Sequence, residues 1–333
     1  FGLVPAALMG VNITALLEQA DRMRNRCLPG EPVDGNPGAR LGVLIGALVL
    51  RERNKLTLLT SPAINRFGLW VEQLIAESTG KEGKGIIPVV GEPVVEPAGY
   101  GNDRLFIYLR LAGDENSATD STIEHIKSSG QPSMVLELQD KYDLGSEFFR
   151  WEFATAIAGA ILSINPFDQP DVQATKQATH HVLQQYVTSG KLPQAGARGS
   201  FADLMAKASA GNYLAIMAYT QETADVDRIT ADIRRKVVER YHIATTLGYG
   251  PRYLHSTGQL HKGGPETGLF LLVTTDHEKD LAIPGEPYTF GTLADAQAMG
   301  DFQALQSLGR PIVRIHLDQG DTASLSELVN KLT

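Results

Sequence analysis

The sequence predicts an α/β protein with mostly parallel sheets flanked by helices. Two observations support this class: short apolar runs alternate with segments whose apolar residues recur at helical spacing, and the alternation occurs twice along 333 residues. A chain of this length can form two domains. Because the turn-rich residues 190–200 separate the two series, we expect one domain at 1–190 and a second, related α/β domain at 200–333.

The first series begins with two apolar helical patterns, expected as helices at 2–27 and 37–51, with a turn-rich stretch between them. Apolar runs then alternate with further helical patterns. We expect strands at 55–60, 85–90, 104–109 and 133–138, and helices at 66–78, 119–129, 145–163 and 170–189.

The second series repeats this order of elements. We expect strands at 212–219, 242–247, 269–274 and 311–317, and helices at 225–240 and 291–308. In both series a helix ends at a glycine and a proline then opens a strand, as at Gly130-Gln131-Pro132 and Gly309-Arg310-Pro311. This favours a repeat of architecture, although any two α/β domains would look alike at this level.

Composition excludes several classes of protein. The net charge is −8 and no basic stripe is present, which argues against nucleic acid as a partner. Cys27 is the only cysteine, so an intrachain disulfide and a thiolate metal site are excluded, and a reducing cytoplasm is expected. The most apolar stretch, Leu41 to Leu50, is too short to span a membrane. Because the chain opens at Phe1 directly in an apolar helical pattern, we interpret it as a piece of a longer polypeptide.

One carboxylate, Glu77, stands where the helix expected at 66–78 runs into a small polar turn. A general base that removes a proton next to a carbonyl must lie within hydrogen-bond reach of that carbon. Ser78, Gly80 and Lys81 add a hydroxyl, a backbone N–H and an ammonium that can bind phosphate or sugar hydroxyls. Taken alone, the motif is better explained as a solvated helix end.

A second polar motif runs from Asn165 to Lys176. Asp168 is expected to cap a helix that Pro170 opens, which places Gln169 at the helix mouth and Lys176 about two turns along. Glutamine suits sugar hydroxyls, and lysine can act as an acid when it is partly desolvated. Taken alone, this motif is better explained as a capped helix with a surface lysine.

Together the two motifs resemble the phosphoglucose isomerases. The pattern Gln-x-x-x-Glu-Ser-x-Gly-Lys from Gln73 to Lys81 is similar to one segment of that family, and Asn-x-Phe-Asp-Gln-Pro-x-Val-x-x-x-Lys from Asn165 to Lys176 is similar to another. Residues 1–7 resemble the start of the family's second sugar-isomerase (SIS) domain. The resemblance implies a SIS-type domain at 1–190 and a degenerate SIS-like domain after it, as in the C-terminal part of bifunctional transaldolase/phosphoglucose isomerase fusions.

The resemblance also implies an activity, the interconversion of glucose 6-phosphate and fructose 6-phosphate. Glu77 matches the base that moves a proton between C1 and C2 through an enediol, and Lys176 matches a residue that helps to open the sugar ring. Gln73 and Gln169 match residues that line the substrate pocket. The expected partner is a sugar phosphate, a homodimer is an expected assembly, and neither a metal nor an organic cofactor is implied.

The sequence departs from the family in three ways. The family's catalytic arginine belongs to a segment that would precede Phe1, and its first sugar-isomerase domain, with the phosphate loop, does not match any part of this chain. Residues 99–105 lack the histidine that assists ring opening, and Asn102 stands at its place. We therefore expect that N-terminal isomerase domains, and a transaldolase domain with them, lie outside this chain, and that the chain alone has little isomerase activity.

A glycine-rich, basic run from Gly248 to Pro265 carries two histidines, His255 and His261. Its His-Ser-x-x-Gln-Leu pattern resembles the histidine-containing run that residues 99–105 lack. This predicts His255 as a catalytic residue and His261 as a substrate-binding one. The alternative is a surface loop whose glycines serve turns.

Two other functions stay open from the sequence. The chain could be a non-catalytic sugar-phosphate-binding or regulatory module, or residues 200–333 could have a purely structural or dimerising role.

Overall fold

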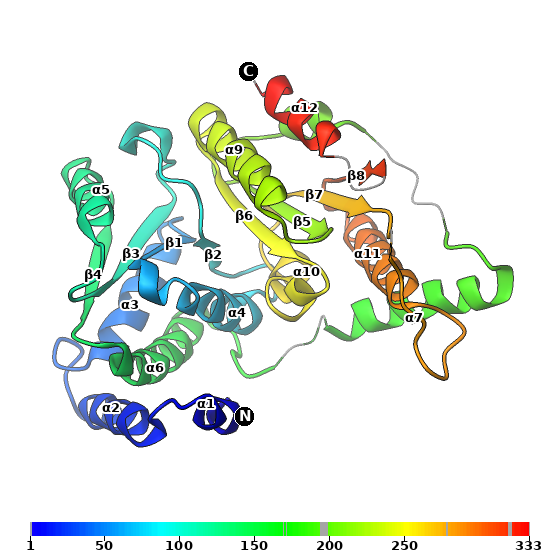
Figure 1. The fold of residues 1–333 in the computed structure, drawn as a ribbon. Helices are drawn as coiled ribbons and strands as arrows, with labels where there is room; N and C mark the ends of the chain where they lie inside the picture. Colours follow the sequence, from blue (N-terminus) through cyan, green and yellow to red (C-terminus); the bar gives the residue numbers. More distant parts are fainter. Residues whose placement is uncertain are drawn as a thin grey trace.

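Two four-stranded sheets, in which every neighbouring pair of strands is parallel, form the centre of the computed structural model (Figure 1). It describes residues 2–168, 170, 172–193, 199–277, 279–318 and 322–332, with the side chains of 172–176 left out. The first sheet has the order β2-β1-β3-β4, with strands β1 (Lys55–Thr60), β2 (Ile87–Val90), β3 (Arg104–Leu111) and β4 (Ser133–Leu138). The second has the order β6-β5-β7-β8, with strands β5 (Tyr213–Tyr219), β6 (Ala244–Tyr249), β7 (Gly268–Thr275) and β8 (Ile312–Leu317).

The two sheets have the same order relative to the sequence: the first strand is central, the second lies on one side, and the third and fourth lie on the other. The predicted α/β class and the repeat of architecture are both confirmed. β3 and β5 are buried along almost their whole length, which is typical of parallel strands covered by helices on both faces and explains their unbroken apolar runs.

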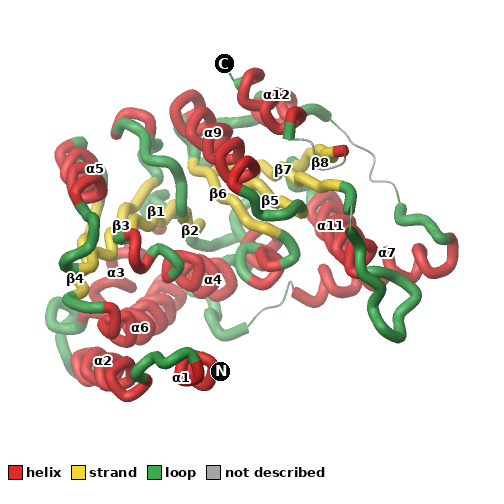
Figure 2. The backbone as a smooth tube through the Cα atoms, viewed as in Figure 1, coloured by secondary structure: helices red, strands yellow, loops and turns green. Residues whose placement is uncertain are grey.

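Of the helices that precede β5 in the sequence, α3 to α6 flank the first sheet, α1 and α2 lie outside α6, and α7 lies beside α11 of the second half (Figure 2). Their bounds are α1 (Leu3–Leu8), α2 (Ile13–Arg26), α3 (Pro37–Val49), α4 (Phe67–Thr79), α5 (Ser117–Ser128), α6 (Leu144–Leu162) and, beyond them, α7 (Val172–Ser189). α3 and α6 are in close contact, because a Cβ at Gly42 would lie 2.5 Å from the carbonyl oxygen of Ala154. Trp151 of α6 is fully buried in the core of this half.

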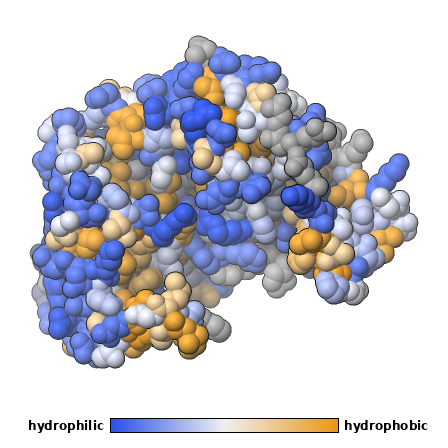
Figure 3. Space-filling model, in the orientation of Figure 1, coloured by the Kyte–Doolittle hydropathy of each residue, from blue (hydrophilic) through white to orange (hydrophobic). Residues whose placement is uncertain are grey.

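The prediction of a single helix at 2–27 is wrong, because the structure has two helices there. Gly10 takes φ +85°, which ends α1, and the side chain of Asn12 accepts a hydrogen bond from the Ala15 N–H to begin α2. α1 has no buried residue. Figure 3 shows apolar residues gathered at this end of the molecule, and Leu8 and Met9 are each 84% exposed.

The second half has α8 (Phe201–Met205), α9 (Ala224–Tyr241), α10 (Gly258–Gly263), α11 (Phe290–Ser307) and α12 (Ala323–Lys331). The run from Gly248 to Pro265 is not a surface loop. It contains a 3₁₀ turn, η4 (Arg252–His255), and α10, and residues 256–262 of this run are buried.

The two sheets meet at their edge strands β2 and β6. Arg234 of α9 donates to the carbonyls of Val90 and Gly91, and Glu92 accepts hydrogen bonds from the backbone N–H and the hydroxyl of Thr245. Arg104 pairs with Glu92 at 2.9 Å. Because Arg234 and Glu92 each form hydrogen bonds across the junction, these buried charged groups fix the two halves relative to one another.

α7 packs on α11 of the second half. Val182 of α7 is fully buried with Ala296 and Met299 of α11. The predicted boundary at 190–200 therefore assigns to the first domain a helix that is held by the second, and the division at 190–200 stays a proposal. Among the described residues, no helix is both long and apolar enough to cross a bilayer.

Candidate functional site

The turn that joins α4 to β2 (residues 80–86, the α4–β2 turn) lies where the two isomerase-like motifs meet. In a strand–helix–strand unit the helix runs back along the sheet, so the C-terminal end of α4 lies near the amino ends of the strands. Glu77 is in the last turn of α4, and Lys81 lies at the start of the α4–β2 turn.

Lys81 joins the first motif to the second. Its ammonium donates to the Asn165 carbonyl at 2.8 Å, to the Asp168 carbonyl, and to Asp168 Oδ1 at 2.8 Å. The Lys81 side chain is 1% exposed, and the hydrogen bond that it donates holds the pKa of Asp168 below its ordinary value. The prediction of Lys81 as a substrate-binding residue is therefore corrected: its three donors hold residues 165–168 against the end of α4 and are not free to bind phosphate.

Glu77 and Gln73 lie on one face of α4, four residues apart. Gln73 Nε2 donates to Glu77 Oε2 at 3.4 Å. Gln73 is exposed, whereas Glu77 and Ser78 are half-buried. A half-buried carboxylate with an amide beside it can both reach a ligand and be held in orientation, as the predicted base requires.

Gly80 contacts the second half of the chain. A Cβ at this position would lie 2.4 Å from the Cα of Leu260 in α10. The Gly80 carbonyl accepts from Gln259 Nε2 at 2.9 Å, and the Gly80 N–H donates to the Ala76 carbonyl. Since both backbone polar atoms have partners and the Cα faces α10, the prediction that Gly80 binds substrate is corrected to a packing role.

Two predicted site residues lie outside what the structure describes. Gln169 is among the undescribed residues, and so is the side chain of Lys176. The backbone of Lys176 belongs to α7, and Asp168, which precedes Gln169, is held by Lys81. The structure thus brings the two motif segments to one region but gives no side-chain geometry for these two residues.

The two histidines of the second half have different environments. His255 is exposed at the end of η4. His261 is buried, with its ring 6.0 Å from that of Tyr253 and 5.1 Å from that of Phe270, and burial lowers its pKa to about 3. His261 is therefore a neutral core residue of the second half, which corrects its prediction as a substrate ligand.

Sequence patterns missed a second carboxylate on α4. Glu72 is 2% exposed, and burial raises its pKa to about 7 against the opposing effect of Arg252 and Arg234 from the second half. Nothing in the sequence marks it, because a Glu between Val71 and Gln73 fits an ordinary amphipathic helix. It lies on the face of α4 that meets the second half, away from Gln73 and Glu77.

A cavity of about 650 Å³ lies at the carboxyl ends of β5 and β7. Thr220 and Gln221 line it just after β5, and Asp276 and His277 just after β7. The chain leaves β5 for one side of the sheet and reaches β7 on the other, so this is the switch point at which open α/β sheets commonly bind ligands. No pattern in the sequence indicated this cavity.

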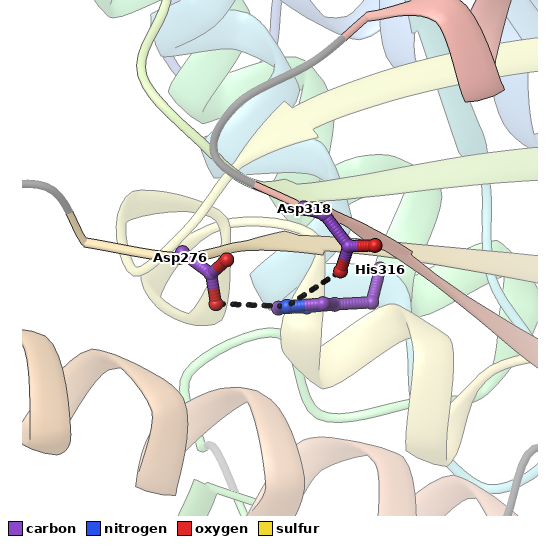
Figure 4. Close-up of side chains that lie close together, drawn as sticks. All are labelled: Asp276, His316 and Asp318. Atoms are coloured by element: carbon purple, nitrogen blue, oxygen red, sulfur yellow. Dashed lines mark hydrogen bonds and ion pairs between the residues drawn. The ribbon is translucent and has the colours of Figure 1, made fainter.

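Asp276, which lines that cavity, lies close to two other exposed side chains, His316 and Asp318 (Figure 4). His316 Nε2 lies 3.1 Å from Asp276 Oδ1 and 4.0 Å from Asp318 Oδ1. These donor types suit a transition metal. Arg314, however, places its guanidinium 3.4 Å from His316 Nδ1, and a fixed positive charge there opposes a cation, so we interpret the group as a surface hydrogen-bond cluster.

No protein-family model matches the chain. Among curated proteins it is 30% identical over 217 residues to the glucose-6-phosphate isomerases of Streptococcus pyogenes serotypes M18 and M5. Each match covers 53% of this chain and 47% of the relative, so the chain spans about half the length of the curated relatives it matches. The predicted resemblance is confirmed as sequence similarity to glucose-6-phosphate isomerases over about half of the chain.

The solved structures that match this chain are less similar to it in sequence than the curated isomerases are. A hypothetical protein from Thermus thermophilus matches with a TM-score of 0.34 and 13% identity, over 99% of this chain and 89% of that one. The C-terminal domain of glucosamine-fructose-6-phosphate aminotransferase from Francisella tularensis matches with a TM-score of 0.28 and 10% identity, over 95% and 91%. Similarity at this level assigns no function.

Proposed function

We propose that this chain carries the general base of an aldose–ketose isomerase that interconverts glucose 6-phosphate and fructose 6-phosphate. The observation that supports this most strongly is the contact of Lys81 with residues 165–168. It joins two motifs that lie 84 residues apart in sequence at Lys81 and Asn165, and both motifs resemble segments of the isomerases to which the chain is similar.

The proposed base is Glu77. In the open-chain aldose its carboxylate takes the proton from C2, the electrons of that C–H bond form the enediol double bond, and the aldehyde oxygen is protonated. Return of the proton from Glu77 to C1, with loss of the proton on the C2 hydroxyl, gives the ketose. No atom is gained or lost and no net oxidation occurs, so the reaction needs no redox cofactor. Lys176 and His255 are proposed to assist ring opening, and Gln73, Ser78 and Gln169 to bind the sugar.

Because the chain spans about half of its relatives, we propose the reaction for the whole protein that carries it. That this protein also has a transaldolase domain, and that it acts in the cytoplasm, remain predictions.

Incubation with fructose 6-phosphate in D₂O tests the proposed proton transfer. We expect deuterium at C2 of the glucose 6-phosphate that forms, measured by NMR, and none with the Glu77→Gln variant. Deuterium incorporation by Glu77→Gln at the wild-type rate would contradict the assignment.

A second candidate is a non-catalytic sugar-phosphate-binding module, and the cavity at the ends of β5 and β7 favours it. Calorimetry with fructose 6-phosphate separates the two candidates. If Ala294→Trp, which would obstruct this cavity, abolishes binding while Glu77→Gln leaves binding and all other functions unchanged, the binding module is the better account.

A further inference from the structure

α10 of the second half is joined directly to the α4–β2 turn. Gln259, which is 1% exposed, donates from Nε2 to the Gly80 carbonyl, and the Gly83 N–H donates to the Gly263 carbonyl at 2.9 Å. Leu260 is packed so closely on Gly80 that a Cβ there has no room. Two hydrogen bonds and a close contact therefore fix the position of α10 against the turn that begins three residues after Glu77.

α10 is itself anchored in the second half by buried charges. Lys262 Nζ lies 2.5 Å from Asp301 Oδ1, and the Tyr253 hydroxyl donates to Asp301 Oδ2 at 2.8 Å. Arg310 donates to the carbonyls of Lys262 and Gly264 at 3.0 and 2.7 Å. Lys262 and Asp301 are almost fully buried. A movement of α10 that separated them would leave two unpaired charges in the protein interior, which is strongly unfavourable.

The same helix, α11, that supplies Asp301 also holds α7. A Cβ at Gly300 would lie 2.9 Å from both the backbone nitrogen and the hydroxyl of Thr179. Thr179 is one turn beyond Lys176, so Gly300 contacts the helix that carries the proposed ring-opening lysine. Asp301, the next residue, holds α10, which contacts the turn after the helix of the proposed base.

We propose that residues 200–333 form a scaffold that sets the position of α4 relative to α7, and that Gln259 is a positioning residue for Glu77. This inference rests on the proposed function, in which Glu77 and Lys176 act on one substrate. A carboxylate that takes a proton from carbon must be placed to within a fraction of an ångström, and a displacement of about 1 Å can reduce turnover up to 100-fold. Gln259 thereby affects turnover without contacting the substrate.

The test compares Gln259→Leu with Gln306→Leu, the same change at an exposed position of α11, in the full polypeptide. For Gln259→Leu we expect kcat to fall on the order of 10-fold, KM for fructose 6-phosphate to change by less than about twofold, and amide exchange to increase in residues 79–86. Gln306→Leu should match the wild type in all three. A wild-type kcat in Gln259→Leu would overturn the proposal.

The Gln259→Glu variant adds a readout that a general loss of stability would not produce. A carboxylate cannot donate to the Gly80 carbonyl, whereas a protonated carboxyl group can. The ratio of variant to wild-type kcat should therefore rise as the pH falls, and a ratio that is independent of pH would count against a positioning hydrogen bond.

Glu77→Gln, assayed alongside, keeps the two proposals apart. If it is inactive and Gln259→Leu is fully active, the scaffold proposal fails and the proposed function stands. If Glu77→Gln is active, the proposed function fails, and amide exchange in residues 79–86 still shows whether α10 holds the turn: no increase in Gln259→Leu overturns that role.

Discussion

Lys81 Nζ lies 2.8 Å from Asp168 Oδ1 and donates as well to two backbone carbonyls of the same segment. One buried ammonium thus connects the helix of the proposed base to the segment that leads into α7. Because the contact joins one motif to the other, it brings into one region two patterns that are unconvincing when each is taken alone.

Replacing Lys81 should release residues 165–168 from α4. Lys81→Met keeps most of the side-chain volume but leaves two partly buried carbonyls without their donor, at a cost of roughly 2 kcal/mol in unfolding free energy. Lys127→Met, which removes an exposed ion pair with Glu124, should cost less than about 0.5 kcal/mol. Urea unfolding measures both values, and equal losses would contradict the structural role of Lys81.

Glu72 should make stability depend on pH. Its pKa is raised by burial from the ordinary 4.5 to about 7, so the folded state binds this proton more tightly than the unfolded state does. The stability from this effect is fully present below about pH 4.5 and is lost as the pH rises to about 7, by at most about 3 kcal/mol.

Glu72→Gln should therefore be more stable than the wild type at pH 8 and lose this advantage near pH 4. Glu82→Gln, at an exposed position, serves as the control. Chemical denaturation across this pH range gives the difference, and a difference between Glu72→Gln and wild type that does not vary with pH would refute the assignment.

Gly80→Ala tests the close contact between α4 and α10. The φ of Gly80 is −78°, which alanine accepts, so the effect would come from the added Cβ against Leu260. We expect a loss of about 1–3 kcal/mol. Gly2→Ala, whose Cβ would meet nothing within 4 Å, should change little, and thermal unfolding of the two variants provides the comparison.

The regular elements could be predicted from the sequence because their burial is periodic. Strands such as β1 and β4 lie where apolar runs were flanked by turn residues. The break between α1 and α2 was missed because a single glycine in an apolar helical pattern is compatible with a continuous helix until its φ of +85° is known.

The candidate site was predicted less completely, because its contacts are between distant residues. The chemistry of Gly80 and Lys81 predicts ligand-binding groups, but in the structure Gly80 packs on Leu260 and Lys81 binds residues 165–168. His261 and the glycines around α10 are typical of a polar loop. In the structure His261 is buried, and α10 packs against the α4–β2 turn. Such roles depend on which partner lies opposite, and no local pattern contains that information.

The central claim is that Glu77 is the base of an aldose–ketose isomerase. Its most direct test is a coupled assay with fructose 6-phosphate, in which the full polypeptide with Glu77→Gln is compared with the full polypeptide with Glu82→Gln. We expect kcat to fall at least about 100-fold for Glu77→Gln, with binding retained, and to stay at the wild-type value for Glu82→Gln. A Glu77→Gln variant that turns over at the wild-type rate would contradict the account.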